Sequence, residues 1–301
     1  MSALRTEPLD ASNLPAFLAF CARHRAHLDD SYLTPSELAA LPSPEHPTCV
    51  AYEGDVVAGA ASLVLDDYHL RSGNGRFRIL YAESSDPQVY HALLDAVRPA
   101  PSRIDSWTVF VRADSADQLD AVLQVGFRVE RSSRILIRPP APIPETQLPF
   151  GIEIRPFVTG KDEGVFAEVR NAAFSTLQGS TTPRTPEEIG DMLREAGSDW
   201  IGAFLMYENG QPVGVVCGMR DASDETEGPM LEIAPLAILP GRQGRGLGTL
   251  LLRHAVRDGA ERAGLPKAVL SVNAENAPAL GLYLREGFRV VQALDCLRQD
   301  L

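Results

Sequence analysis

The feature that most constrains the fold is a repetition, because two short phrases occur in both halves of the chain in the same order. "AYEGDVVAGAAS" around Tyr52 is matched by "MYENGQPVGVVCG" around Tyr207. Each phrase is an apolar strand, a polar Gly turn and a second apolar strand, which is typical of a hairpin. "LQVGFRVERS" around Phe127 is matched by "LREGFRVVQA" around Phe288, at a nearly equal offset of 161 residues (288 − 127) against 155 (207 − 52). The repetition predicts a tandem duplication of one α/β unit.

A proline-rich stretch, "IRPPAPIPETQLPF" at 137–150, lies between the two copies. Its prolines exclude helix and sheet interiors, so it is interpreted as a stiff linker. We therefore expect a first domain over 1–140, a linker over 141–150 and a second domain over 151–301. Strands alternate with helical patterns in the second copy, which predicts a mixed α/β class with a central mixed β-sheet flanked by helices in each domain.

Composition restricts the classes of function. A chain of 301 residues fits two domains of ordinary size. The net charge of −12 argues against a general nucleic-acid binder and leaves room for cationic substrates. The sequence has neither a signal-peptide layout nor an apolar run of membrane-spanning length. We expect a cytoplasmic protein with no nucleic-acid or membrane partner, and we leave open a monomer or a homodimer. Isolated cysteines indicate reduced, buried thiols and no metal site: Cys21, Cys49, Cys217 and Cys296.

The second copy has a readable order of elements. The stretch from Thr185 predicts a helix with a capping box, with Pro186 at its first turn and Glu188 at the matching position. The interleaving of strands and helices predicts a partly parallel sheet with a site at its carboxyl edge. The expected elements are a strand at 151–157, helices at 160–174 and 185–197, a hairpin at 200–220, a strand at 228–240, a helix at 244–264, a strand at 267–273, a helix at 276–287 and a strand at 288–297.

The densest glycine cluster, "GRQGRGLGTLLL" at 241–252, leads into the longest of these helices. A helix start favours anions, because its first amides are unpaired and the helix dipole is positive there. A triphosphate loop would need Gly-Lys-Ser/Thr, but Gly246 is followed by Leu-Gly-Thr. A dinucleotide site would need an acidic residue about twenty positions later, where Pro266 stands. A turn whose glycines serve packing alone remains as an alternative.

The stretch "LEIAPLAILPGRQGRGLGTLLL" resembles the central motif of the GNAT family of acyl-CoA-dependent N-acyltransferases. That motif is a strand ending in Val/Ile-x-Pro, followed by Arg/Gln-x-x-Gly-x-Gly/Ala at a helix start. "NAENAPALGLYLREGF" is similar to a second signature of the family, and the resemblance covers most of 152–301. The matching residues are Ile238 and Pro240 for the strand end, Gln243, Gly246 and Gly248 for the turn, and Asn276, Tyr283, Gly287 and Phe288 for the second signature.

The resemblance implies that acetyl-CoA is the co-substrate and that no metal takes part. Main-chain amides from Gln243 to Thr249 would hold the CoA pyrophosphate, and glycine allows the close approach. Arg242 and Arg245 add positive charge, whereas Arg253, further along the helix, is expected to form a surface ion pair. The complete set of expected cofactor-binding residues is Leu236, Ala237, Ile238, Arg242, Gln243, Gly244, Arg245, Gly246, Leu247, Gly248, Thr249 and Asn276.

The implied chemistry is direct transfer of the acetyl group to an amine, without a covalent enzyme intermediate. An amine with a pKa near 10 must lose a proton before it attacks. Glu232 matches the family's carboxylate position and is expected to act as general base through a water, or else to bind the substrate as an anion. Tyr283 matches the general acid for the CoA thiolate, with simple packing as its alternative role. A main-chain N–H near Ile238 would stabilise the tetrahedral intermediate. Asn276 would contact the pantetheine arm or cap its helix.

The first copy lacks this turn. Aligning Phe127 with Phe288 places Val122 opposite Tyr283. The corresponding stretch, "LYAESSDPQVYHALLDAV", contains no glycine and carries Glu83 and Asp86, which would repel a pyrophosphate. We expect the first copy to keep the fold without binding CoA.

The predicted function is therefore acetyl transfer to a primary amine in the second copy. A small-molecule amine is the expected acceptor, and a protein amino terminus or a lysine is the alternative. The acidic stretch "DASDETEG" at 221–228 would attract such amines or form a solvated loop tip. The alternative from another class is a non-catalytic, structural tandem module that binds CoA.

Overall fold

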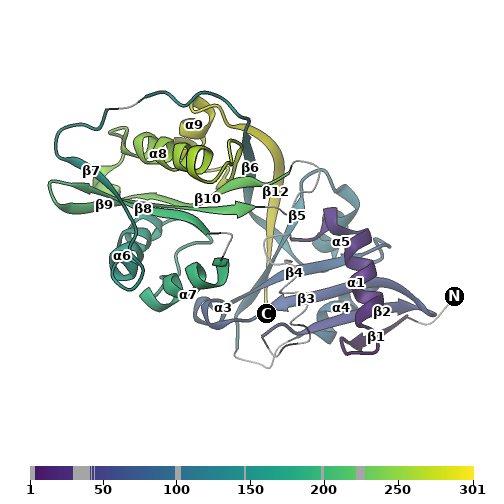
Figure 1. The fold of residues 1–301 in the computed structure, drawn as a ribbon. Helices are drawn as coiled ribbons and strands as arrows, with labels where there is room; N and C mark the ends of the chain where they lie inside the picture. The colour runs from purple at the N-terminus through teal and green to yellow at the C-terminus, as the bar shows by residue number, and fades with distance from the viewer. Residues whose placement is uncertain are drawn as a thin grey trace. The chain divides into compact units, whose positions relative to one another are not determined.

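The computed structural model divides the chain into two compact units (Figure 1). The N-terminal unit comprises Met1–Ser133 together with Ala293–Leu301, and the C-terminal unit comprises Arg134–Gln292. Residues 222–227, most of the acidic stretch at 221–228, lie outside the described residues. The structure describes residues 4–29, 41, 43, 45–98, 103–145, 147–197, 200–221 and 228–301.

The two sequence copies contain their strands and helices in nearly the same order, as the repetition predicted. The first copy contains β1 (Leu4–Pro8), α1 (Leu14–Arg23), the 3₁₀ turn η1 (Arg25–His27), β2 (Thr48–Glu53), β3 (Val56–Val64), α3 (Asp67–Ser72), β4 (Asn74–Ala82), α4 (Pro87–Ala96), β5 (Ser106–Arg112), α5 (Ala116–Gln124) and β6 (Arg128–Arg138). The second contains β7 (Ile152–Pro156), α6 (Glu163–Phe174), α7 (Pro186–Ala196), β8 (Trp200–Glu208), β9 (Gln211–Asp221), β10 (Met230–Ile238), the 3₁₀ turn η4 (Pro240–Arg242), α8 (Leu247–Arg262), β11 (Ala268–Asn273), α9 (Ala277–Arg285) and β12 (Arg289–Asp300).

Each unit is built on a mixed sheet, which confirms the predicted fold class. In the N-terminal unit the strand order is β1-β2-β3-β4-β5-β12, with β4 parallel to β5 and the other pairs antiparallel. In the C-terminal unit the order is β6-β11-β10-β9-β8-β7, with β10 parallel to β11. The predicted capping box is present, because the Thr185 hydroxyl and the Glu188 carboxylate each accept from the other residue's N–H.

The last strand of each sequence copy completes the sheet of the unit built mainly from the other copy. β12 pairs antiparallel with β5, from Leu294 opposite Arg112 to Asp300 opposite Ser106. Leu297 on β12 is fully buried in the core of the N-terminal unit. Conversely, the end of β6, Arg134–Arg138, belongs to the C-terminal unit, where β6 neighbours β11.

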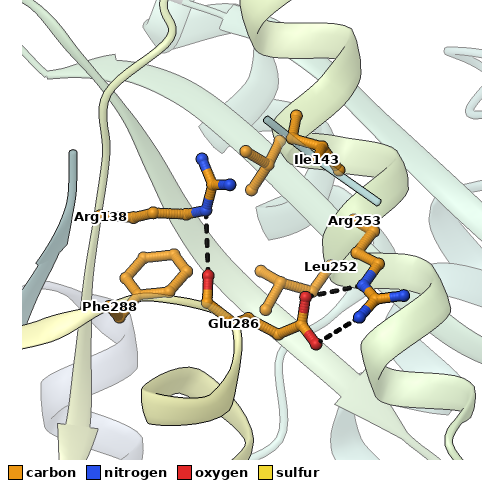
Figure 2. Close-up of a pocket in the computed structure, with 7 residues that line it drawn as sticks. Arg138, Ile143, Leu252, Arg253, Glu286 and Phe288 are labelled. Carbon is orange, nitrogen blue, oxygen red and sulfur yellow. Dashed lines mark hydrogen bonds and ion pairs between the residues drawn. The ribbon is translucent and has the colours of Figure 1, made fainter. Parts of the chain in front are cut away.

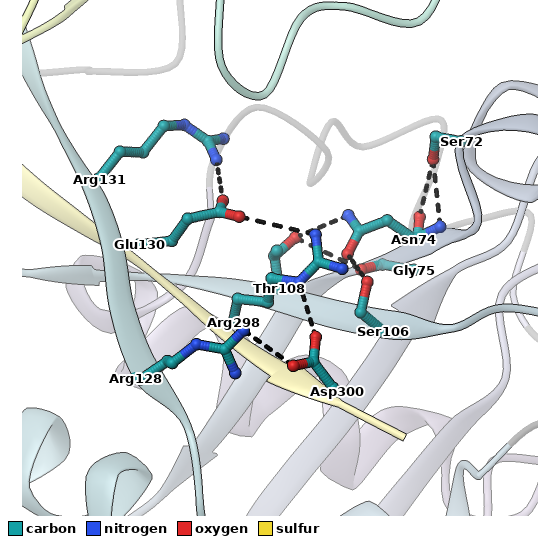
Figure 3. A network of polar contacts seen from close by, with 10 residues as sticks. All are labelled: Ser72, Asn74, Gly75, Ser106, Thr108, Arg128, Glu130, Arg131, Arg298 and Asp300. Atoms are coloured by element: carbon teal, nitrogen blue, oxygen red, sulfur yellow. Dashed lines mark hydrogen bonds and ion pairs between the residues drawn. The ribbon is translucent and has the colours of Figure 1, made fainter.

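Polar contacts accompany β12 in the N-terminal unit (Figure 3). Asp300 accepts from Arg128 at 2.8 Å and from Arg298 at 3.0 Å, and Arg298 also lies 3.6 Å from Glu130. Such exposed pairs contribute at most about 1 kcal/mol each. Full burial of Leu297 contributes about 1.5–3 kcal/mol, more than any one of these ion pairs.

The repeated Gly-Phe phrase is a helix-ending motif in both copies. Gly126 and Gly287 have left-handed φ values of 97° and 86°. The N–H groups of Phe127 and Phe288 donate to the carbonyl five residues earlier, at 3.3 and 3.0 Å. This is the Schellman pattern, which needs a residue without a Cβ at the left-handed position. The sequence match therefore has a local structural cause.

Helices cover both faces of the sheet in the C-terminal unit (Figure 1). α8 and α9 pack on one face, in a cluster that includes Leu231, Val216 and Leu251, while α6 and α7 cover the other, with Val215 and Cys217. Neighbouring residues of β9 thus enter different clusters, as expected for a strand buried on both faces. All four cysteines are buried and free, as predicted. Among the described residues, no helix is both long and apolar enough to cross a membrane.

Candidate active site

The site is built around the glycine turn, residues 241–249, between β10 and α8. Gly244 and Gly246 have φ values of 75° and 79°, which an L side chain adopts only with strain. Gly246 is the N-cap of α8, and no side chain in the described part of the chain caps this helix. The first amides of α8, from Leu247 onward, therefore point past the helix start without an intrahelical acceptor.

The turn is joined to the strand before it and to the helix that carries the second signature. The Gln243 side-chain nitrogen donates to the carbonyl oxygen of Ile238 at 2.9 Å. A Cβ on Gly248 would lie 3.2 Å from Leu282 of α9, so glycine here permits the close approach of α8 and α9. The structure thus brings together three predicted parts of the site, namely the end of β10, the turn and α9.

Both arginines of the turn contact one carboxylate that the sequence did not single out for the site. Arg245 contacts Glu208 with two nitrogens, at 2.5 and 3.2 Å, and Arg242 approaches the same carboxylate at 3.3 Å. The Arg245 guanidinium holds the pKa of the Glu208 carboxyl below its usual value. Glu208 lies in the repeated hairpin phrase, far from the turn along the sequence, so no local pattern predicts this contact.

The β10 and β11 strands separate beside the glycine turn. They pair only at Leu231 with Ala268 and at Glu232 with Val269, and β10 then has an irregular register against β9 before Leu236. Beyond that point, residues 236–238 pair with β9 alone. Among the described residues this segment has no pairing with β11, and the carbonyl oxygen of Ile238 already accepts from the Gln243 side chain. We call the place where β10 no longer pairs with β11 the opening between these strands, and the predicted residues Leu236, Ala237 and Ile238 lie on its β10 side.

Glu232 lies where the two strands separate. Its side chain is half-buried, and its pKa is raised by burial first and by the nearby charge of Asp221 second. Its neighbours Leu231 and Ile233 pack in the cluster of α8 and α9, so Glu232 lies on the other face of the strand, which α6 and α7 cover. Its charge also contributes to the raised pKa of the Cys217 thiol. A carboxyl group with a raised pKa is a stronger base than an exposed one.

Tyr283 lies on the opposite face, in the cluster of α8 and α9. It is 8% exposed, and burial raises its pKa to about 12. Within the described part of the chain its hydroxyl makes no hydrogen bond. Glu232 and Tyr283 therefore lie on opposite faces of the sheet, and the structure records no contact between them.

Asparagines organise the neighbouring turns. The side chain of Asn276 accepts from the N–H of Ala279 at 3.3 Å and so caps α9, one of its two expected roles. Asn273, at the carboxyl end of β11, donates to the carbonyl oxygen of Gln178 at 3.0 Å and so links this strand to the loop between α6 and α7. Asn273 was not predicted, since a single asparagine after a strand carries no specific signal.

In the first copy, acidic side chains occupy the start of α4, the helix that corresponds to α8. Asp86 caps α4 by accepting from the N–H of Gln88 at 2.9 Å, where the second copy has uncapped Gly246. Glu83 contacts Arg23 at 2.9 Å and His24 at 2.8 Å. A negative side chain therefore already occupies this helix start.

The opening between β4 and β5 is also filled from within the N-terminal unit. These strands pair only from Asn74 to Phe77 on β4. Beyond that point the carbonyl oxygen of Arg78 accepts from the N–H of Asp29 at 3.0 Å, and that of Leu80 accepts from the Gln118 side chain at 3.2 Å. Protein groups thus occupy this place in the N-terminal unit.

Comparisons with known proteins address the family of this chain. The model of the acetyltransferase (GNAT) family matches residues 166–288, which contain the glycine turn and α9. The chain is 34% identical over 239 residues to the mycothiol acetyltransferase of Streptomyces bingchenggensis, covering 77% of this chain and 70% of that protein. It is 30% identical over 244 residues to the mycothiol acetyltransferase of Frankia alni, covering 76% and 67%. The chain therefore belongs to the GNAT family of acetyltransferases, and the protein is an acetyltransferase enzyme.

Solved structures agree on the fold. A GCN5-related N-acetyltransferase from Sphaerobacter thermophilus superposes with a TM-score of 0.72 at 20% identity, covering 99% of this chain and 95% of that one. A tandem GNAT protein from the clavulanic acid biosynthesis pathway gives 0.69 at 14% identity, covering 99% and 98%. At these identities the likeness concerns the fold, and it supports two tandem GNAT units.

Proposed function

We propose that the C-terminal unit transfers an acetyl group from acetyl-CoA directly to the primary amine of a small molecule. One observation carries this proposal: the uncapped glycine turn of α8 lies beside the opening between β10 and β11, and Glu232 lies where those strands separate. The proposed anion site, the segment of β10 that would border the acyl group and the proposed base then belong to one continuous stretch of chain.

The CoA pyrophosphate would bind at the start of α8. Its charge is stabilised by the unpaired amides of residues 247–249 and by the positive end of the helix dipole. Arg242 and Arg245 are already held beside the turn by Glu208, so they need little reordering to add their charge. The pantetheine arm would pass the β11 side of Leu236–Ile238.

Glu232 would act as the general base, through a water molecule. The attacking amine is mostly protonated at neutral pH, and its proton passes to the Glu232 carboxylate. The negative charges of Glu232 and Asp221 together would also attract an ammonium group to this end of the strand. A side chain whose pKa is raised toward neutrality matches this task better than an ordinary carboxylate.

Tyr283 would serve the leaving group. The amine nitrogen attacks the thioester carbon, and a main-chain N–H near Ile238 stabilises the negative oxygen that forms. The carbon–sulfur bond then breaks, and the Tyr283 hydroxyl gives its proton to the departing sulfur. The tyrosinate regains a proton from solvent, to which Glu232 releases the protons taken from the amine. Its pKa of about 12 keeps this hydroxyl protonated over the working pH range. The net products are the N-acetylated amine and CoA as a free thiol.

The acceptor would be a small-molecule amine of the kind that mycothiol acetyltransferases acetylate. The similarity to those proteins and the net charge of −12 both favour a cationic small molecule. We further propose that CoA binds only in the C-terminal unit. Asp86 at the start of α4, and the internally satisfied opening between β4 and β5, support that restriction.

The test follows free thiol release from acetyl-CoA with a panel of amines that includes the deacetylated form of mycothiol. Amine-dependent release with a 1:1 stoichiometry of CoA binding is the expected result. Binding of two CoA molecules would contradict the restriction to one unit. Release that proceeds only with protein amino termini or lysines would contradict the small-molecule acceptor.

A further inference from the structure

Two arginines from different elements hold the carboxyl end of α9 (Figure 2). Arg138, the last residue of β6, donates from Nε to the main-chain oxygen of Glu286 at 3.0 Å. Arg253 of α8 contacts both oxygens of the Glu286 carboxylate, at 2.7 and 2.8 Å. Glu286 is the C-cap of α9, so its carbonyl has no partner within the helix. This one residue is therefore fixed through its main chain and its side chain.

Arg138 is a buried cation held almost entirely by main-chain groups. Only 6% of it is exposed. Its Nη2 donates to the carbonyl oxygens of Ala141 at 3.2 Å and Pro142 at 3.1 Å, and its buried Nη1 has no acceptor among the described residues. Burying a guanidinium is costly unless its hydrogen bonds compensate. A residue that served solubility or simple packing would not be placed in this way.

The same device recurs in the N-terminal unit. Gln299 of β12 stands 161 residues after Arg138 (299 − 138), the offset that relates Phe288 to Phe127. Its Nε2 donates at 2.9 Å to the carbonyl oxygen of Val125, the C-cap of α5. In each unit, the last strand of the other sequence copy thus holds the end of the equivalent helix. The unit with the glycine turn uses a guanidinium, and the other unit uses an amide.

The held residue lies close to the proposed acid. The N–H groups of Glu286 and Phe288 donate to the carbonyl oxygen of Tyr283, at 3.1 and 3.0 Å. The Tyr283 and Phe288 rings also pack edge to face, with centroids 5.8 Å apart. Fixing Glu286 therefore fixes the last turn of α9, which carries Tyr283. Through Arg253, the same turn is tied to the helix that begins at the glycine turn.

We propose that Arg138 is a positioning residue of the acetyltransferase: by holding the Glu286 carbonyl, it sets the place of the Tyr283 hydroxyl relative to the start of α8. The inference rests on the proposed function in one respect, the role of Tyr283 as donor to the leaving sulfur. It assigns catalytic importance to a residue of the first sequence copy, which lies at the start of the proline-rich stretch.

The test compares Arg138→Met with Gln299→Met, its matched control at the equivalent position. Arg138→Met should lower kcat roughly tenfold, because small misplacements of a reacting group are costly. The KM for acetyl-CoA should stay within about twofold, since the glycine turn is untouched. Gln299→Met should leave kcat unchanged. Arg138→Lys keeps a donor and should recover part of the loss, and it provides the test if Arg138→Met folds poorly.

A measurement that needs no substrate tests the role of Arg138 independently of the proposed function. Amide hydrogen exchange at Glu286–Phe288 should accelerate in Arg138→Met, and unchanged exchange there would overturn the inference whatever the activity. In a Tyr283→Phe background, Arg138→Met should lower kcat little further, because both changes act on one group. Fully additive losses would overturn the route through Tyr283. Failure of the proposed function itself would be seen in the wild-type protein, as an absence of amine-dependent thiol release.

Discussion

Replacing Gly246 by alanine tests whether the glycine turn is required for its backbone conformation. Gly246 has a φ of 79° and a ψ of −1°, in the left-handed region. An L residue there costs about 1–2 kcal/mol. A Cβ would meet no atom within 4 Å, so no clash adds to this figure. For a domain of about 150–250 residues, each kcal/mol lowers the unfolding midpoint by roughly 2–4 °C, which gives an expected loss of about 2–8 °C.

Gly241 supplies the control within the same turn. It also has open space around its Cβ position, but its φ is not in the left-handed region. Gly241→Ala should therefore cause no loss and can gain up to about 1 kcal/mol, because alanine restricts the unfolded chain. Differential scanning calorimetry of the two variants gives the comparison. Equal midpoints for both variants would refute the argument from φ.

The same pair of variants tests ligand binding. In Gly246→Ala the added methyl group stands where the pyrophosphate is proposed to approach the amides, so acetyl-CoA affinity should fall by more than about tenfold, or 1.4 kcal/mol. Gly241→Ala should bind within a factor of about two of wild type. Isothermal titration calorimetry measures both. A Gly246→Ala protein that is destabilised yet binds acetyl-CoA normally would remove the turn from the binding site.

Glu232→Gln should lower kcat and remove the rise of kcat with pH that ionisation of this carboxyl causes. The substitution should also stabilise the fold above the raised pKa of Glu232, because the buried carboxylate opposes folding only once it is ionised. Unfolding measured at one pH below and one above that pKa checks the sign. Leu297→Ala should lower the free energy of unfolding by about 2–5 kcal/mol and alter the near-ultraviolet circular dichroism of buried Trp107, which shares its core. A change confined to the C-terminal unit would contradict the placement of β12. Asn273→Ala should accelerate amide hydrogen exchange around Gln178, because it removes the hydrogen bond to that carbonyl, and unchanged exchange there would contradict the link.

The sequence by itself determined the features that depend on neighbouring residues. The capping box at Thr185, the Schellman ends at Gly126 and Gly287 and the left-handed glycines of the turn each involve groups within a few positions along the chain. Local φ and ψ preferences and hydrogen-bond geometry are sufficient to predict such motifs. The duplication could be predicted for the same reason, because both copies repeat the same short hairpin and helix-ending motifs.

Only the tertiary structure decided which sheet each closing strand joins. β6 and β12 both begin with Arg-Val after the same Gly-Phe ending, so strand periodicity does not distinguish their partners. That choice places Arg138 beside α9 and Gln299 beside α5. The contact of Glu208 with the arginines of the glycine turn could not be predicted from the sequence either. Contacts between residues far apart in the chain depend on how sheets and helices pack, which no local preference specifies.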